Sequence, residues 1–231
     1  YNWDLVTSSW INSSKTEYDF DANNNLTLDI QYIWDLATSS WIGSQKKEFT
    51  FDINNQPVLQ LFYNWDVISN SWIGSYKCEY GYNNNNQILY IAYNWYPATN
   101  AWLESVKDVT TYDANSNIVM NIRFEWDTIT NIWLENNKVE YSYDMNNNPI
   151  LRLHYNWDLF TSSWIEFYKN EGAFDANNNQ TLYANYAWDL ATSSWIGAQK
   201  HQHTFDANNN NTSTTNYTWD FATNSWIENS R

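Results

Sequence analysis

The 231-residue chain is poor in cysteine, proline, glycine and basic residues, with one Cys, three Pro, five Gly and 11 Lys plus Arg. A single cysteine, Cys78, excludes an internal disulfide framework. Against 26 acidic residues and a net charge of −15, the chain lacks the clustered cations that neutralise nucleic-acid phosphates. No run of about 18 apolar residues is present. We therefore expect neither a nucleic-acid partner nor a membrane span.

Aromatic residues are abundant, because 16 Trp, 18 Tyr and 10 Phe make up 19% of the chain. Such a content argues against intrinsic disorder, which requires few aromatics. The length and the apolar mass allow a core in one or two domains.

The tryptophans reveal a repeat. All 16 fall into eight pairs whose members are seven residues apart, and successive pairs are 31 residues apart except for one interval of 30. The pairs are Trp3 and Trp10, Trp34 and Trp41, Trp65 and Trp72, Trp95 and Trp102, Trp126 and Trp133, Trp157 and Trp164, Trp188 and Trp195, and Trp219 and Trp226. A cation follows each pair by five residues, at Lys15, Lys46, Lys77, Lys107, Lys138, Lys169, Lys200 and Arg231. A fixed period of this kind indicates a single repeat array. Its units are 1–31, 32–62, 63–92, 93–123, 124–154, 155–185, 186–216 and a partial unit, 217–231.

Each unit contains two segments with the periodicity of β-strands. Residues 26–34 alternate strictly and place aromatic and β-branched side chains on one face, which predicts a strand with one apolar face. Residues 41–51 alternate less cleanly and predict a second, more polar strand. On this second strand Trp41 and Phe49 are expected to share one face, and Lys46 and Glu48 the other.

Two turns join these strands into a hairpin. In residues 34–41, Asp35 is placed to accept hydrogen bonds from the backbone and from hydroxyl groups, with Trp34 and Trp41 facing each other across the hairpin end. In residues 21–25, a run of asparagines suits backbone with positive φ. Each unit is therefore predicted to be one β-hairpin.

The predicted fold class is all-β: an antiparallel meander of about 15 strands built from 31-residue β-hairpin repeats, as a β-solenoid or a curled sheet. Since one face is dense with Trp, Tyr and Leu, we expect it to be covered. Either the sheet curls around this face, or two sheets pack face to face. The 16 tryptophans are accordingly predicted to be structural core positions of the repeat.

At the asparagine turn the sequence resembles the YD repeats of RHS-type proteins, whose hallmark is Tyr-Asp-Ala-Asn-Gly-Asn. The matching segments are residues 20–25, 112–117 and 143–148, with Asn or Ser in place of the turn glycine. The longer unit, with its Trp-Asp…Thr-x-x-Trp hairpin and Lys-x-Glu segment, is similar to tandem arrays in secreted Bacteroidota surface proteins. The resemblance covers the whole chain and implies a hairpin array and export rather than an activity.

Two groups of residues are candidates for metal binding. The spacing of Asp21, Asn23 and Asn25 mimics the start of a calcium loop, but Leu26 and Tyr32 stand where that loop needs a Gly and a bidentate Glu. Turn chemistry is therefore favoured over calcium.

The second metal candidate is the pair His201 and His203, which would point to one strand face. No third ligand recurs near this pair, and we favour a surface substitution. No nucleophile elbow, phosphate loop or Cys/His dyad occurs, so we expect no catalytic residue and no cofactor. The recurring Lys-x-Glu segments, such as Lys46 and Glu48, are expected to form a solvated charge ladder.

These features favour an extracellular structural repeat protein, such as a filament subunit, a stalk or an adhesin shaft. Its partners would be copies of itself or flanking repeats, because neither end of the array carries an atypical capping unit. One alternative is a carbohydrate-binding module in which exposed aromatics bind surface glycans at several equivalent sites. Another is an RHS-like shell that encloses a partner. The expected location is the cell surface.

Overall fold

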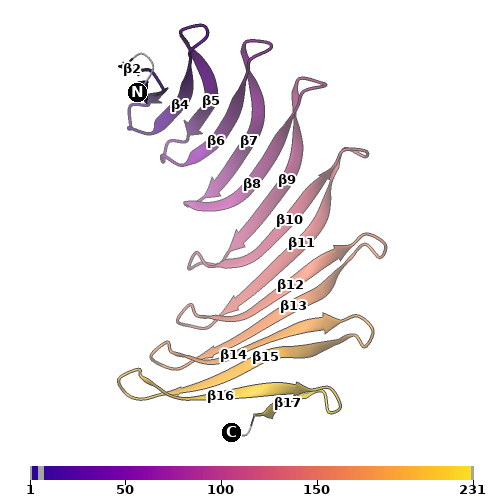
Figure 1. The fold of residues 1–231 in the computed structure, drawn as a ribbon. Coiled ribbons are helices and arrows are strands. Elements are labelled where there is room, and N and C mark those ends of the chain that lie inside the picture. The colour runs from indigo at the N-terminus through magenta and orange to yellow at the C-terminus, as the bar shows by residue number, and fades with distance from the viewer. Residues whose placement is uncertain (1, 5–7, 230–231) are drawn as a thin grey trace. The chain divides into compact units, whose positions relative to one another are not determined.

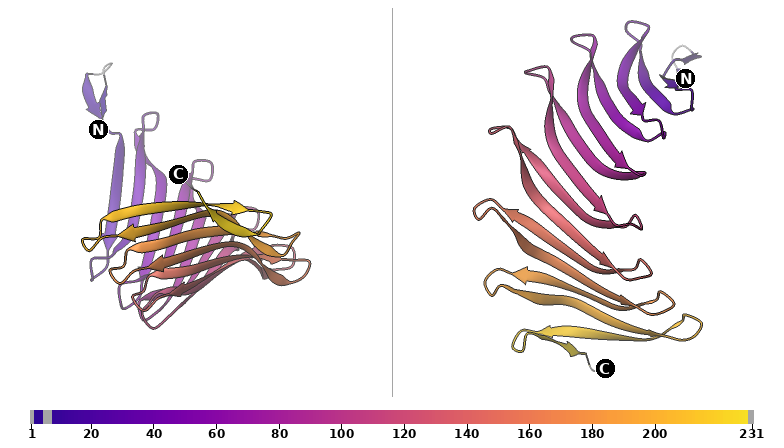
Figure 2. Two further views of the ribbon diagram at one scale, coloured as in Figure 1. Left: turned by 90° about the horizontal axis from the view of Figure 1, so that it is seen from below. Right: turned by 180° about the vertical axis from the view of Figure 1, so that it is seen from behind.

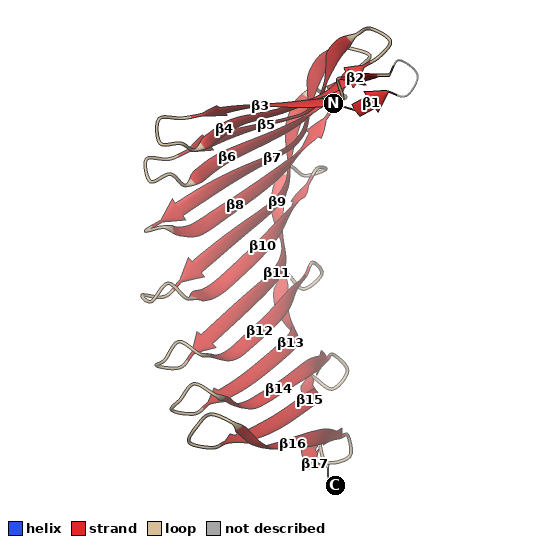
Figure 3. Ribbon diagram, turned by 60° about the vertical axis from the view of Figure 1, so that its left-hand side comes forward, coloured by secondary structure: helices blue, strands red, loops and turns tan. Residues whose placement is uncertain are grey.

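A computed structural model describes residues 2–4 and 8–229, with residues 2–4 and Ser9 described in their backbone alone. Strands joined by turns make up this part of the chain, and no helix occurs in it (Figure 3). The all-β prediction is confirmed. The strands are β1 (Asn2–Asp4), β2 (Ser9–Ile11), β3 (Ser14–Phe20), β4 (Leu26–Asp35), β5 (Ser40–Phe51), β6 (Pro57–Asp66), β7 (Ser71–Asn83), β8 (Asn86–Tyr96), β9 (Ala101–Tyr112), β10 (Ile118–Asp127), β11 (Ile132–Tyr143), β12 (Pro149–Asp158), β13 (Ser163–Phe174), β14 (Gln180–Asp189), β15 (Ser194–Phe205), β16 (Asn211–Asp220) and β17 (Ser225–Glu228).

The strands pair in chain order. The 15 strands from β3 to β17 form one antiparallel meander, with β3 and β17 as its edge strands, as predicted (Figure 1). Strands β1 and β2 form a separate two-stranded hairpin, in which Trp3 is paired with Trp10.

The chain divides into two compact units, Tyr1–Asp108 with Trp126–Ile132, and Val109–Glu125 with Trp133–Arg231. Within each unit the hairpins lie side by side in a single layer (Figure 2). Within each unit, the described hairpins have no second layer stacked on them (Figure 2).

A bulge in the second strand of the hairpin reverses the side-chain alternation. In the ladder between β4 and β5, Tyr32 lies opposite Gly43 and Gln31 opposite Gln45, which leaves Ser44 unpaired. The same shift recurs between β6 and β7, β12 and β13, and β14 and β15. One extra residue moves all following side chains to the other face. Lys46 therefore lies opposite Ile30 and on the same face as Trp41, and the predicted separation of Lys46 and Glu48 from Trp41 is wrong.

The asparagine turns replace glycine with residues that tolerate positive φ. Asn24 has φ 63°, and its N–H donates to the carbonyl of Asp21 at 3.1 Å, the geometry of a type I turn followed by a left-handed residue. In the unit that is one residue shorter, Asn84 and Asn85 have φ 48° and 68°, as in a two-residue type I′ turn. None of the glycines has positive φ. Asparagine, or serine at Ser116, thus adopts the positive φ at the position where the RHS hallmark has glycine.

Side-chain amides connect successive asparagine turns. The Nδ2 group of Asn25 donates to Oδ1 of Asn55 at 2.9 Å, and Asn179 donates to Asn209 in the same way at 2.9 Å. Asn117 and Asn148 donate to Asn147 and Asn178, respectively. These amides tie four of the turns to the next turn within the same compact unit.

Few side chains of this single layer are completely buried. The surface exposed to solvent is 14677 Å², whereas a compact protein of this length exposes about 11,000 Å². Among the described residues, the deeply buried apolar side chains are small: Cys78, Ala92 and Ala184. The large side chains all keep some exposure, because they shield one another sideways along the sheet rather than beneath a second layer.

Candidate functional site: a repeated cluster on the tryptophan face

The turn between the paired tryptophans is closed by an aspartate. Oδ1 of Asp35 accepts the N–H of Ala37 at 3.0 Å, and Oδ2 accepts the hydroxyl of Thr38 at 2.6 Å. Ser39 adopts φ 49°, and the hydroxyl of Ser40 lies 2.8 Å from that of Thr38. This arrangement confirms the predicted turn chemistry.

The two tryptophans of a pair meet edge to face. The ring centroids of Trp34 and Trp41 lie 5.1 Å apart at an interplanar angle of 74°. We call the face that carries these pairs the tryptophan face. The same arrangement is found for Trp65 with Trp72, Trp95 with Trp102, Trp157 with Trp164, Trp188 with Trp195, and Trp219 with Trp226.

The tryptophans are less buried than the prediction of a covered core requires. Trp102 and Trp164, the second members of their pairs, are only half-buried, and so are the other described tryptophan side chains except Trp10, which is 67% exposed. The expectation of full cover is therefore corrected for Trp102, Trp164 and their equivalents. The physical reason is that each ring is shielded by its partner and by the neighbouring hairpin, with no second layer above it in the described part of its compact unit. The side chain of Trp3 lies outside that part.

Glycine allows three of the tryptophan pairs to pack against the preceding hairpin. A Cβ atom on Gly43 would lie 2.7 Å from Trp65 and 2.8 Å from Trp72. Gly197 is tighter still, with a Cβ at 2.3 Å from Trp219 and 2.4 Å from Trp226. These pairs therefore rest on bare backbone. Gly74 plays the same part against Trp95 and Trp102, while Glu stands at the corresponding positions 104, 135, 166 and 228.

A lysine of one hairpin lies over the aromatic rings of the next. Nζ of Lys46 lies 4.1 Å from the ring centroid of Tyr63 and 5.9 Å from that of Trp72. In the same way, Lys138 lies 5.4 Å from the ring centroid of Trp164. Lys46 also donates to Glu48, two residues along the same strand, at 2.8 Å. Because the side chain of Lys46 is only 17% exposed, the rings cover its stem and face its charge, a cation–π arrangement.

The glutamate completes the cluster by accepting the tyrosine hydroxyl. Tyr155 donates to Oε2 of Glu140 at 3.1 Å, while Lys138 donates to Oε1 at 2.6 Å. Burial, together with the charge of Glu140, raises the pKa of Tyr155 to about 12. We call this arrangement the Lys–Glu–Tyr cluster. It is formed by Lys15, Glu17 and Tyr32; Lys46, Glu48 and Tyr63; Lys77, Glu79 and Tyr93; Lys138, Glu140 and Tyr155; and Lys169, Glu171 and Tyr186.

The predicted solvated charge ladder is therefore only half correct. The glutamates of the clusters are 36–50% exposed, but the lysines, apart from Lys15, are 15–17% exposed. The cluster escaped sequence reasoning because its members come from different hairpins. The signal was nevertheless present, since a Tyr follows the Glu by 15 residues in four of the five clusters. Arg231, the last cation of the repeat, lies outside the described residues.

The turn aspartates make stability depend on acid pH. Hydrogen bonds from Thr161 and from the N–H of Phe160 hold the pKa of Asp158 below its ordinary value, and equivalent bonds do the same for Asp189. A folded-state pKa below the unfolded one contributes stability above the unfolded pKa, near 3.9, which is lost as pH falls through the folded pKa. We therefore expect the Tm to be flat between pH 7 and about 5 and to fall below about 4. Thermal unfolding followed by circular dichroism at each pH tests this.

An Asp158→Asn variant is the control, because asparagine keeps the shape of the turn but does not titrate. Its Tm is expected to be lower at pH 7 and to decline less on acidification. A wild-type Tm that rises between pH 4 and 3 would contradict the assignment.

The calcium candidates serve the asparagine turn. Oδ1 of Asp21 accepts the backbone N–H groups of Asn23 and Asn25 at 2.8 and 2.9 Å. Oδ2 accepts the Nδ2 group of Asn25 at 2.9 Å. Asn25 thus presents nitrogen, not oxygen, to the carboxylate, as the favoured turn interpretation requires.

The histidine candidates lie on one face of β15, with ring centroids 6.4 Å apart. Nδ1 of His201 lies 2.5 Å from Oδ1 of Asn216, and Nδ1 of His203 lies 2.9 Å from the hydroxyl of Thr214. Throughout the described residues, no group of three or more His, Cys, Asp or Glu side chains could hold a metal ion. Nor do residues 2–4 and 8–229 contain a helix long and apolar enough to cross a membrane.

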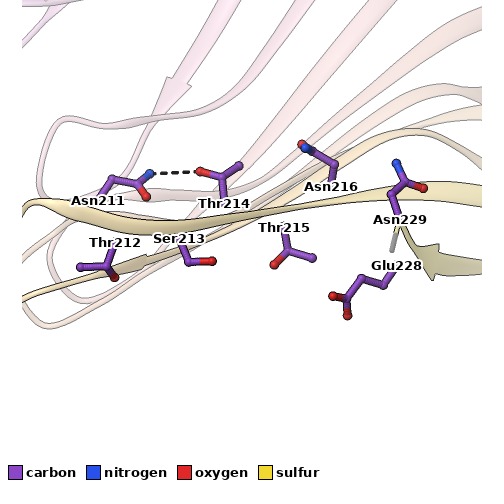
Figure 4. A pocket seen from close by; sticks show the side chains of 8 residues that line it. All are labelled: Asn211, Thr212, Ser213, Thr214, Thr215, Asn216, Glu228 and Asn229. Atoms are coloured by element: carbon purple, nitrogen blue, oxygen red, sulfur yellow. Dashed lines mark hydrogen bonds between the residues drawn. The ribbon is translucent and has the colours of Figure 1, made fainter. Parts of the chain in front are cut away.

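A polar hollow of about 640 Å³ lies beside β16 (Figure 4). It is lined by residues 211–216 together with Glu228 and Asn229. Within it, Asn211 donates to the hydroxyl of Thr214 at 3.3 Å. Its lining is hydroxyl and amide groups with one carboxylate, a composition without a nucleophile–base pair.

The chain shows weak structural similarity to some solved structures and no sequence match to a known family. No protein-family model matches the chain, and no curated protein matches it. A Bacteroides fragilis protein of unknown function is similar with 14% identity and a TM-score of 0.44, over 56% of this chain and 92% of that one. A DUF3836 family protein from Bacteroides vulgatus has 14% identity and a TM-score of 0.34, over 41% of this chain and 91% of that one. The Photorhabdus luminescens Tc holotoxin pore has 12% identity and a TM-score of 0.37, over 94% of this chain and 12% of that one.

Proposed function

We propose that this protein is an extracellular structural repeat protein without catalytic activity, acting as a filament subunit, a stalk or an adhesin shaft. The supporting observation is that lysines only 15–17% exposed join one hairpin to the next in four of the clusters. Lys169 and Glu171, for example, contact Tyr186 of the following hairpin at 4.2 Å from the ring centroid and 3.1 Å from the hydroxyl, respectively. An active site is built once, whereas this contact recurs along the array and distributes stability over nearest neighbours.

Copies of the same chain, or flanking repeats, are the proposed partners. The cell-surface location is part of the proposal and rests on the resemblance of the repeat to secreted surface arrays. Immunolabelling of intact producing cells tests the location: label on unpermeabilised cells supports it, and label confined to permeabilised cells contradicts it.

Negative-stain electron microscopy of the native, untagged protein tests self-assembly. We expect regular filaments whose subunit spacing reports how the copies join. Sedimentation velocity over a hundredfold concentration range is the control, because genuine assembly shifts with concentration. Discrete monomeric particles at every concentration would overturn the filament proposal.

A second candidate is a multivalent carbohydrate-binding array, which is favoured by the half-buried state of the tryptophans. Quenching of tryptophan fluorescence by acrylamide separates the two functions. For a structural array we expect partial quenching that xylan, cellulose and mannan oligosaccharides leave unchanged. Protection of several tryptophans by one of these sugars would instead support the carbohydrate-binding array.

A further inference from the structure

The face opposite the tryptophan face carries a row of side chains, most of them aromatic rings, in which one position is a glycine. Three residues after each lysine of the array stand Tyr18, Phe49, Tyr80, Thr110, Tyr141, Gly172 and His203. Gly172 is therefore a gap where most hairpins place a ring. We call this second face the tyrosine face.

A hollow of about 370 Å³ occupies this gap, within the size range of small-ligand sites. Its lining includes Tyr141 on β11, Arg152 on β12, Asn170 on β13 and Tyr183 on β14. All four belong to the same compact unit. The hollow is thus bounded by two aromatic rings with polar side chains between them.

Tyr183 has one ring face without a side-chain neighbour across the ladder. It is paired with His201 on one side and with Gly172 on the other. Its ring stacks on His201 at a centroid distance of 6.5 Å and an angle of 11°. On the other side Gly172 offers no side chain, and a Cβ there would lie 2.9 Å from the carbonyl oxygen of Pro149. The backbone contact keeps the position bare, and the side chains that come nearest to it are those of Phe174 and Gln180, at 3.4 and 3.5 Å from the position of that Cβ. No ring lies directly opposite Tyr183 across this ladder.

The polar groups of the hollow are not used up by the fold. The guanidinium of Arg152 lies 5.5 Å from the ring centroid of Tyr141, and it has no hydrogen bond or ion pair to any other described residue. The amide nitrogen of Asn170 donates to the hydroxyls of Tyr168 and Tyr183 at 3.2 and 3.4 Å, which leaves its Oδ1 as an acceptor. The carboxylate of Glu171 is held on the other face of the sheet by Lys169 at 2.7 Å. The hollow therefore presents the free planar donor fork of Arg152 and an amide oxygen beside the ring of Tyr183.

We propose that this hollow on the tyrosine face binds a saccharide, with a pyranose ring stacked on Tyr183 and its hydroxyls bound by Arg152 and Asn170. A pyranose has a flat face of C–H groups and a rim of hydroxyls, which matches an aromatic platform flanked by a guanidinium donor and an amide oxygen that accepts. Saccharide binding here would be a function additional to the proposed structural role, and it does not depend on that role.

The same features disfavour other ligands. A nucleotide would need several cations for its phosphates, whereas Arg152 is the one cation in the lining of the hollow. An extended peptide would need unpaired backbone, but strands β11 to β14 are paired on both sides. A hydroxyl-rich sugar ring requires neither several cations nor unpaired backbone.

Isothermal titration of the whole chain tests the proposal with two groups of probes: cellohexaose, xylohexaose and mannohexaose as neutral sugars, and a galacturonate hexamer as an acidic one. We expect at least one probe to bind with one site per chain. Tyr183→Ala is expected to weaken that binding at least tenfold, and Tyr141→Ala to weaken it less. Arg152→Gln should abolish binding of the galacturonate hexamer if that is the ligand, and weaken a neutral hexamer a few-fold.

Tyr90→Ala is the matched control. Tyr90 occupies the same repeat position as Tyr183, but it lies opposite Tyr80 rather than a glycine. This variant should bind as the wild type does, with folding of all variants checked by circular dichroism. Absence of binding by the wild type to all four probes, several sites per chain, or unchanged binding by Tyr183→Ala would each overturn the proposal. Several sites that survive Tyr183→Ala would instead indicate the tryptophan face.

Discussion

Replacing Gly197 with alanine is expected to lower the free energy of unfolding by about 1–3 kcal/mol, the range for overpacking a well-filled position. The added Cβ would lie 2.3 Å from Trp219 and 2.4 Å from Trp226, so the tryptophan pair must move off β15. Urea unfolding followed by tryptophan fluorescence measures the change. The circular dichroism of the coupled Trp pair should weaken in the same variant.

The matched control for Gly197→Ala lies at the same repeat position in another hairpin. Glu166→Ala removes a side chain where one is already accommodated, so its effect on the free energy of unfolding should stay within about 0.5 kcal/mol. Equal destabilisation by the two variants would show that the glycine does not set the packing of the tryptophan pair.

Replacing Lys169 with methionine is the second change expected to have a large effect. Methionine keeps an apolar stem but removes the charge that lies 2.7 Å from Glu171, 4.2 Å from the ring centroid of Tyr186 and 5.2 Å from that of Trp195. Because Lys169 is only 17% exposed, solvent replaces little of what is lost. We expect the free energy of unfolding to fall by about 1–3 kcal/mol. Urea unfolding at low and high salt measures it.

Two other lysines calibrate the result for Lys169. Lys15 makes the same kinds of contact but is 37% exposed, so Lys15→Met should cost less than about 1 kcal/mol. Lys200 lies 4.1 Å from the ring centroid of Tyr217, but Gln202 stands where the other clusters have a glutamate. Lys200→Met therefore isolates the cation–π contribution. If Lys15→Met proves as damaging as Lys169→Met, burial is not the source of the effect.

The features that the sequence predicts best are local ones. The tryptophan pair and the aspartate that closes its turn lie within eight consecutive residues, so their chemistry follows from spacing alone. The strand order follows from the repeat, because short turns leave consecutive strands as neighbours. The meander of hairpins is accordingly confirmed.

The features that escaped prediction depend on a single residue or on the next hairpin. Ser44 is one extra residue in an otherwise alternating strand, and periodicity cannot distinguish it from its neighbours. That bulge decides whether Lys46 meets Tyr63 or points away from it. The gap at Gly172 was visible in the sequence as a missing ring, but its meaning required the ring of Tyr183 opposite it on the adjacent strand.

The degree of burial also escaped prediction, because it depends on whether a second layer exists. Alternation along a strand identifies the face that carries Trp102 or Trp164, but it does not say what lies above that face. The half-buried state of these rings follows from lateral packing between hairpins, which only the structure shows.

The Lys–Glu–Tyr cluster also has a consequence for how such a chain can change its length. A hairpin with the cluster offers a Lys–Glu pair to its successor and a tyrosine to its predecessor, so a duplicated block of 31 residues taken from such hairpins would arrive with both halves of its contacts. A block of half that size would instead bring an asparagine turn to the edge that carries the tryptophan turns. Gain and loss of whole hairpins is thus the step by which the array could grow or shrink during evolution without new side-chain chemistry.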